Sequence, residues 1–145
     1  MKSLALSWPV WALLSAAFAA LTAIFAKVGV ETVNSDVATL VRTVVILVVL
    51  AALLGASGQL AEAAALSPRA YLFLVLSGLA TGASWLCYFR ALKLGDAAQV
   101  APLDKLSVVL VAVFATVFLG ERLSGVNWLG IGLIGLGAVL VTLKA

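Results

Sequence analysis

The sequence predicts an all-α membrane protein, a single domain over residues 1–145 built as a bundle of five transmembrane helices. Its mean hydropathy is +1.25, and 65% of its residues are hydrophobic against 10% charged. A soluble core of this size neither needs nor could hide so much apolar surface. Five apolar stretches also approach the roughly 20 helical residues that cross a hydrocarbon core of roughly 30 Å. The spans are predicted near residues 6–26, 37–54, 71–89, 98–119 and 126–143.

The first span is rich in small residues, which let helix backbones approach closely. Four-residue spacing relates Ala12, Ala16 and Ala20. Trp8 and Trp11 stand near its start, where interfacial aromatic residues are common. The uncharged run over residues 3–26 is longer than the apolar region of a signal peptide, about 7–15 residues, so we expect it to be retained as a span.

The second span begins after Asn34, Ser35 and Asp36, which form a credible N-cap group. It stops at Gly55. Only 12 residues separate Arg42 from Gly55, which is roughly 18 Å of helix. That length is too short to cross the bilayer, so we expect Arg42 to lie within the thickness of the membrane.

The third span opens at Pro68, which is tolerated in a first helical turn. Its polar and aromatic side chains Ser84, Trp85 and Tyr88 are candidates for lining a solute pathway. The fourth span follows a turn at Gly95.

The fourth span also carries charge into the membrane. Only 15 uncharged residues separate Lys105 from Glu121, or about 22 Å, so the helix must start near Ala98. It then takes Asp104 and Lys105 into the bilayer. Pro102 predicts a kink, because its ring frees a carbonyl one turn earlier. Exposed backbone at depth is tolerated where protein buries it or a wet cavity meets it.

The fifth span is distinguished by its glycines, which we expect to serve helix packing or dimerisation. They are Gly130, Gly132, Gly135 and Gly137. Their spacing matches a dinucleotide-binding fingerprint literally, but that motif works only after a strand in a βαβ unit. At 100° per residue, Gly130 and Gly137 share one face, and Gly132 and Gly135 share nearly the opposite one. Such a helix is clamped between neighbours, or packs once within the subunit and once against another copy.

Counting along five spans places Arg42, Asp104 and Lys105 at similar depth in the same half of the bilayer. Charges in hydrocarbon are costly, so they normally pair or face water. Three interpretations stay open. Asp104 forms a structural ion pair with Arg42 or Lys105, the group forms a substrate or ion site, or the cations snorkel to the interface. Asp104 has the shortest reach and is the most informative residue.

The Lys and Arg residues outside the membrane are nearly balanced between its two sides. The N-terminal side has Lys2, Arg69 and Arg122, and the other side has Lys27, Arg90, Lys93 and Lys144. Arg42 is a possible fifth on the second side. The positive-inside rule therefore puts that side in the cytoplasm only weakly, and a bias this small also fits insertion in both orientations.

Several functions are disfavoured by composition. The chain has no histidine, no clustered carboxylates and no nucleophile–base pair, so we expect no enzyme activity, no metal site and no cofactor. Its one cysteine, Cys87, has no partner for an internal disulfide. The cations are scattered singly, and no basic patch indicates nucleic acid.

The second half carries a family resemblance. The segments that carry it are residues 88–98 (YFRALKLGDAA), Pro102, residues 118–124 (FLGERLS) and residues 128–132 (WLGIG). They resemble an EamA domain of the drug/metabolite transporter superfamily, and the resemblance implies a five-span, half-length member. Family members typically carry two five-span repeats in inverted orientation and move small organic solutes, often outward. The resemblance therefore implies a homodimer, in an antiparallel arrangement, and the balanced charge count agrees with that.

One departure from the superfamily matters. Small multidrug resistance proteins use a glutamate in the first helix to couple protons to drugs. No acidic residue occurs over residues 3–26, so that mechanism does not carry over.

We therefore expect a secondary transporter of a small organic solute or metabolite, an exporter acting as a dimer, in a bacterial or archaeal plasma membrane. The alternative is a non-transporting membrane subunit whose intramembrane charges are structural. A transporter should place its polar residues around one hydrated cavity, whereas a structural subunit should bury them dry and paired. The residues concerned are Arg42, Ser84, Trp85, Tyr88 and Asp104. No substrate or coupling ion is named by the sequence.

Overall fold

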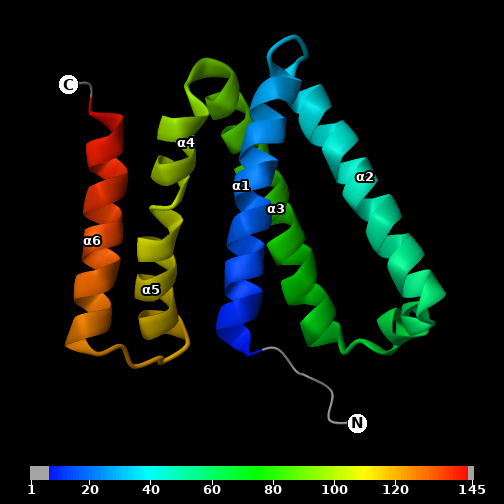
Figure 1. The fold of residues 1–145 in the computed structure, drawn as a ribbon. Helices are drawn as coiled ribbons and strands as arrows, with labels where there is room; N and C mark the ends of the chain where they lie inside the picture. Colours follow the sequence, from blue (N-terminus) through cyan, green and yellow to red (C-terminus); the bar gives the residue numbers. More distant parts are fainter. Residues whose placement is uncertain (1–6, 144–145) are drawn as a thin grey trace. The chain divides into compact units, whose positions relative to one another are not determined.

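A computed structural model describes residues 7–143, and no strand occurs within them. Its helices are α1 (Trp8–Val30), α2 (Ser35–Ala56), a short 3₁₀ helix η1 (Gln59–Ala65), α3 (Pro68–Leu94), α4 (Ala97–Asp104), α5 (Ser107–Phe118) and α6 (Gly125–Thr142) (Figure 1). Counting α4 and α5 as one segment, five are long and apolar enough to cross a membrane. The predicted fold class is confirmed.

Most predicted span limits lie within four residues of the helices. The exception is α3, which continues to Leu94, five residues beyond the predicted end. Leu6, with which the first predicted span begins, and the counted cations Lys2 and Lys144 lie outside the described residues.

The described residues fall into two compact units, residues 25–93 and residues 7–24 together with 94–143. Organisation as one domain therefore stays a prediction.

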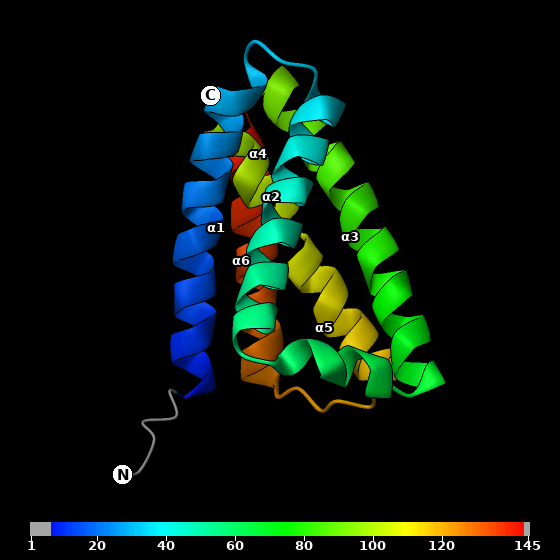
Figure 2. The same ribbon diagram turned by 90° about the vertical axis from the view of Figure 1, so that its right-hand side faces the viewer.

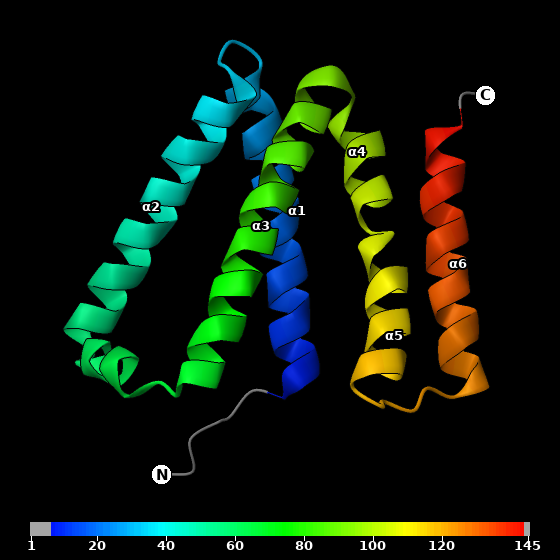
Figure 3. The same cartoon turned by 180° about the vertical axis from the view of Figure 1, so that it is seen from behind.

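In the unit of residues 25–93, α2 and α3 are close together where α2 begins and α3 ends, and they are apart where η1 joins them (Figures 2 and 3). The side chain of Asn34 caps α2, because its Oδ1 accepts hydrogen bonds from the backbone N–H groups of Asp36 and Val37. At the other end, Gly58 adopts a φ of 73°, a left-handed conformation that glycine tolerates best, and η1 follows it.

In the other unit, α6 runs antiparallel beside the segment formed by α4 and α5 and contacts both (Figure 1). Gly120, with a φ of 69°, lies in the turn that reverses the chain. Ser124 caps α6, since its Oγ accepts from the backbone N–H of Asn127 at 3.3 Å. Small side chains are buried on the packed helices, including Ala112 and Ala138. This close packing is the arrangement that small residues allow between membrane helices.

Large apolar side chains cover the outer surface of every long helix. Phe18, Leu47, Leu79, Phe118 and Leu129 are each more than 60% exposed. A soluble monomer rarely presents apolar surface on this scale. Lipid chains solvate such apolar side chains well, so these exposed side chains are those of a multi-pass membrane protein.

Candidate functional site

The most distinctive polar group in the described chain is the guanidinium of Arg42 on α2. Its Cζ lies 3.1 Å from the ring centroid of Trp85 and 5.5 Å from that of Phe89, both on α3. Phe89 is 2% exposed, and Arg42 and Trp85 are half-buried. A cation over an aromatic face is attracted by the ring quadrupole, by about 2 kcal/mol or more when desolvated. Trp85 therefore holds the charge against α3.

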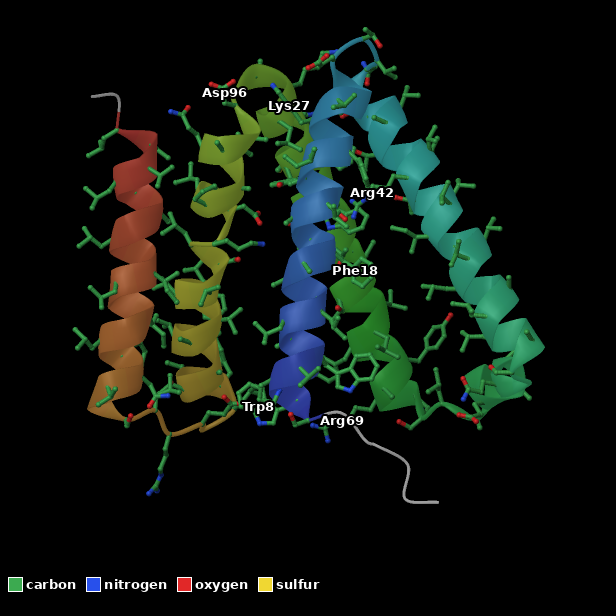
Figure 4. All side chains as sticks on the ribbon, viewed as in Figure 1. Trp8, Phe18, Lys27, Arg42, Arg69 and Asp96 are labelled. Carbon is green, nitrogen blue, oxygen red and sulfur yellow. The ribbon has the colours of Figure 1, made fainter. Side chains whose placement is uncertain are left out.

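The distance of this contact from the helix ends can be counted along α2 and along α3 separately. Arg42 follows the first residue of α2 by seven positions, or about 10 Å. Trp85 precedes the last residue of α3 by nine positions, or about 14 Å. Figure 4 shows Lys27 near one end of this unit, Arg69 at the other and Arg42 between them. The guanidinium thus lies along the apolar length of the helices rather than at their ends.

Carboxylates of the same unit do not neutralise Arg42. Asp36 binds Arg90, with Oδ2 2.8 Å from Nη2. Arg42 takes part neither in this ion pair nor in the one between Lys105 and Asp104. Tyr88, half-buried on α3, lies close enough to interact electrostatically with the guanidinium. Ser84, adjacent to Trp85, is exposed.

The second polar feature is an interruption between α4 and α5. Around it, backbone hydrogen bonds tighten to a three-residue spacing, from the N–H of Lys105 to the carbonyl of Pro102 and from the N–H of Leu106 to the carbonyl of Leu103, each 3.0 Å. The break itself falls at Lys105 and Leu106, three residues beyond Pro102. Lys105 Nζ lies 3.3 Å from Oδ2 of Asp104, and 36% of the Asp104 side chain is exposed. The interruption therefore carries a charged pair into the spanning segment.

Arg42 and Asp104 belong to different units. Each has a described contact within its own unit, Trp85 for the first and Lys105 for the second. A direct pair between them stays a prediction.

The α6 glycines differ in their surroundings. A Cβ placed on Gly135 would lie 3.1 Å from Cγ2 of Val109 on α5, and it would approach Leu106 beside the helix interruption. A Cβ on Gly130, Gly132 or Gly137 would meet nothing within 4 Å. Gly135 thus lets α6 approach the interrupted segment, while Gly130 and Gly137 lie on an open face.

The sequence did not predict the backbone contacts of two lysines in the unit of residues 25–93, at the end where α2 begins and α3 ends. Lys27 Nζ donates to the carbonyl of Leu92 at 2.9 Å, and Lys93 Nζ donates to the carbonyl of Val33 at 2.6 Å. Position alone indicated membrane-edge anchors. Their placement near helix ends was the available signal, since cations there can bind the last carbonyls of a helix, as Lys27 does at Leu92, whereas Lys93 binds a carbonyl of the connection between α1 and α2. Phe89 was also missed, because an apolar residue in an apolar span carries no distinguishing signal.

Within residues 7–143, no group of three or more His, Cys, Asp or Glu side chains is placed to hold a metal ion. Arg42, Asp104, Lys105 and the neighbouring aromatic residues offer charge recognition and hydrogen bonding.

Five apolar helices with charged groups along their length define a multi-pass membrane protein. Residues 6–143 match the model of the EamA-like transporter family, and the chain belongs to that family. The resemblance seen in the sequence is confirmed. The chain is also 67% identical, over 135 residues, to a Sinorhizobium sp. protein named "Uncharacterized transporter in cobO 3'region". That alignment covers 93% of this chain and 96% of the relative. None of the solved structures gave a match.

Proposed function

We propose that this protein is a secondary transporter that exports a small organic solute or metabolite as a dimer of five-helix repeats. The observation that carries the proposal is the interrupted segment formed by α4 and α5, where Asp104 and Lys105 lie at the break. Broken helices with polar groups at depth are typical of secondary transporters, which build their sites at such breaks. A helix that served only as an anchor would gain nothing from the interruption.

The dimer is supported by length and by the open face of α6. The Sinorhizobium relative aligns with this chain over 96% of its own length, and the aligned 93% of this chain holds its five apolar segments. Inverted-repeat transporters place their sites at the interface between two repeats, so a single repeat needs a second copy to complete one. Gly130 and Gly137 offer a smooth face to such a copy. An antiparallel arrangement agrees with the balanced Lys and Arg count.

Reconstitution tests the proposal. Purified protein in liposomes is loaded with a panel of labelled organic solutes, and efflux is followed with an imposed proton or sodium gradient and without one. We expect gradient-dependent flux of at least one solute class. Protein-free liposomes and liposomes holding an Asp104→Asn variant serve as controls.

The alternative, a non-transporting membrane subunit, is favoured by the Arg90–Asp36 pair, which is complete without any solute. It predicts no flux from a folded, reconstituted preparation with any member of the panel. It also predicts that the protein co-purifies with a different membrane protein rather than with a second copy of itself.

A further inference from the structure

The spanning segments hold more positive than negative charge at depth. Arg42 and Lys105 are cationic and Asp104 is anionic, so two positive charges against one negative leave a net charge of +1. Asp104 neutralises one cation, whichever one it pairs with, and in the structure its partner is Lys105. Neither ion pair described among residues 7–143 includes Arg42, and a charge without a counter-ion is costly in hydrocarbon.

Arg42 is the cation left over. Within its own unit, Asp36 is bound by Arg90, and the described contacts of the Arg42 guanidinium are with the rings of Trp85 and Phe89 and, electrostatically, with Tyr88. The Cζ of this planar group lies over the ring of Trp85, 3.1 Å from its centroid. A guanidinium carries five N–H donors, and the indole nitrogen of Trp85 is itself only a donor, so Trp85 leaves the N–H groups of Arg42 to an acidic ligand.

This geometry defines the chemistry of a ligand. The donors of an arginine fork match two oxygens of one acidic group, which makes charge-assisted bidentate bonds stronger and more specific than neutral ones. The indole fixes the orientation of the fork and limits its freedom to snorkel. Half-buried Trp85 and Tyr88 also provide aromatic surface beside it for an apolar body. A neutral or cationic solute would leave the charge of Arg42 unmatched.

We propose that Arg42, held by Trp85, binds the acidic group of a small organic anion with an apolar body. The inference rests on the proposed function, since this anion is the transported solute, and it narrows the substrate to carboxylates, sulfonates or phosphate esters. An anionic lipid headgroup has the same acidic chemistry, so the experiment separates a free solute from a lipid.

The test measures binding to the full chain in nanodiscs of phosphatidylcholine, without any gradient. Labelled benzenesulfonate is the anionic probe, benzenesulfonamide is its neutral counterpart, and benzyltrimethylammonium is the cationic one. We expect the Kd of benzenesulfonate to be lower than that of either other probe by a factor of about ten or more. One charge-assisted pair contributes enough binding free energy for that difference. Arg42→Gln should bring the ratio close to one. Arg69→Gln removes the same charge at the opposite end of the unit and should leave the ratio unchanged.

Two further variants keep the test decisive. Arg42→Lys retains the charge but loses the fork and the stacking, so the ratio should fall several-fold while the protein stays folded. It replaces Arg42→Gln if that variant does not fold. Trp85→Leu should weaken benzenesulfonate binding more than benzenesulfonamide binding, because it frees the guanidinium.

Four results overturn the proposal. The wild type prefers the neutral or cationic probe, or shows no preference. Arg42→Gln, when folded, retains the anion preference. Arg42→Lys retains the full ratio. Adding phosphatidylglycerol to the nanodiscs abolishes benzenesulfonate binding, which assigns the site to lipid headgroups instead of a solute. Because binding is measured without flux, these failures are separate from a failure of the transport proposal, which only the liposome assay can show.

Discussion

Arg90 and Asp36 are 54 positions apart in sequence and are joined by two hydrogen bonds. Arg90 Nε lies 3.1 Å from Oδ1, and Nη2 lies 2.8 Å from Oδ2. The two bonds together form the bidentate arrangement of a guanidinium and a carboxylate. They connect the first turn of α2 with the last part of α3, beside the backbone contacts of Lys27 and Lys93. This end of the unit is therefore tied together by polar side chains, whereas the helices separate toward η1.

Removing this pair should lower thermal stability. Asp36→Asn and Arg90→Gln should each reduce the melting temperature, because each leaves the partner charge without its bidentate contact. The double variant should lose little more than either single one, since all three remove the same interaction. Asp96→Asn is the control, because Asp96 makes no side-chain capping bond to α4. Fully additive losses in the double variant would show that the two residues act independently.

The glycines of α6 should separate internal packing from self-association. Gly135→Leu places its side chain against Val109, where even a Cβ would lie 3.1 Å from Cγ2, so overpacking should cost about 1–3 kcal/mol and lower folded yield. A Cβ placed on Gly137 would meet nothing within 4 Å, so Gly137→Leu should fold normally. It should instead shift the protein from dimer toward monomer.

Light scattering in detergent and cysteine cross-linking along α6 measure that shift. An unchanged dimer in Gly137→Leu and in Gly130→Leu would place the interface on another surface.

Insertion in both orientations is the third prediction. A tag at the C-terminus should be accessible from both sides of sealed vesicles, because the Lys and Arg counts are nearly equal. Adding two lysines to one loop should bias the distribution, since orientation follows the positive charge of short loops. A single orientation in the wild type would remove the antiparallel dimer without removing transport.

Asp104 should matter for transport more than for folding. Its partner Lys105 is adjacent in sequence, and 55% of the Lys105 side chain is exposed. Exposed ion pairs are typically worth about 1 kcal/mol or less. Asp104→Asn should therefore leave yield and melting temperature near normal and abolish gradient-driven flux.

The three quantities are measured on one preparation, with Glu121→Asn as a control outside the helices. A large loss of folded yield indicates a structural pair, for which breaking a buried contact costs about 3–5 kcal/mol. Normal values in all three assays would make Asp104 a bystander.

The sequence by itself determined the fold class, an all-helical chain with five segments long and apolar enough to span a membrane. A bilayer selects continuous apolar helices, because no water within it can satisfy exposed backbone groups. Span length and hydropathy are local properties, so they can be counted along the chain. The counting ended α3 too early, because it stopped before the charges at Arg90 and Lys93. Helical hydrogen bonding continues through charged residues, and here their side chains reach Asp36 and the carbonyl of Val33.

Only the tertiary structure decided which side chains Arg42 and Asp36 contact. Counting placed Arg42 at depth and marked Trp85 as a candidate, but only the packing of α2 on α3 brings the guanidinium within 3.1 Å of the indole centroid. In the same packing, Asp36 forms its ion pair with Arg90 rather than with Arg42. Side-chain partners depend on how helices far apart in sequence approach and rotate, and hydropathy contains no information about either. The physical reason is that lipid chains and helix faces are equally apolar, so shape and polar contacts, rather than hydrophobicity, fix the arrangement between membrane helices.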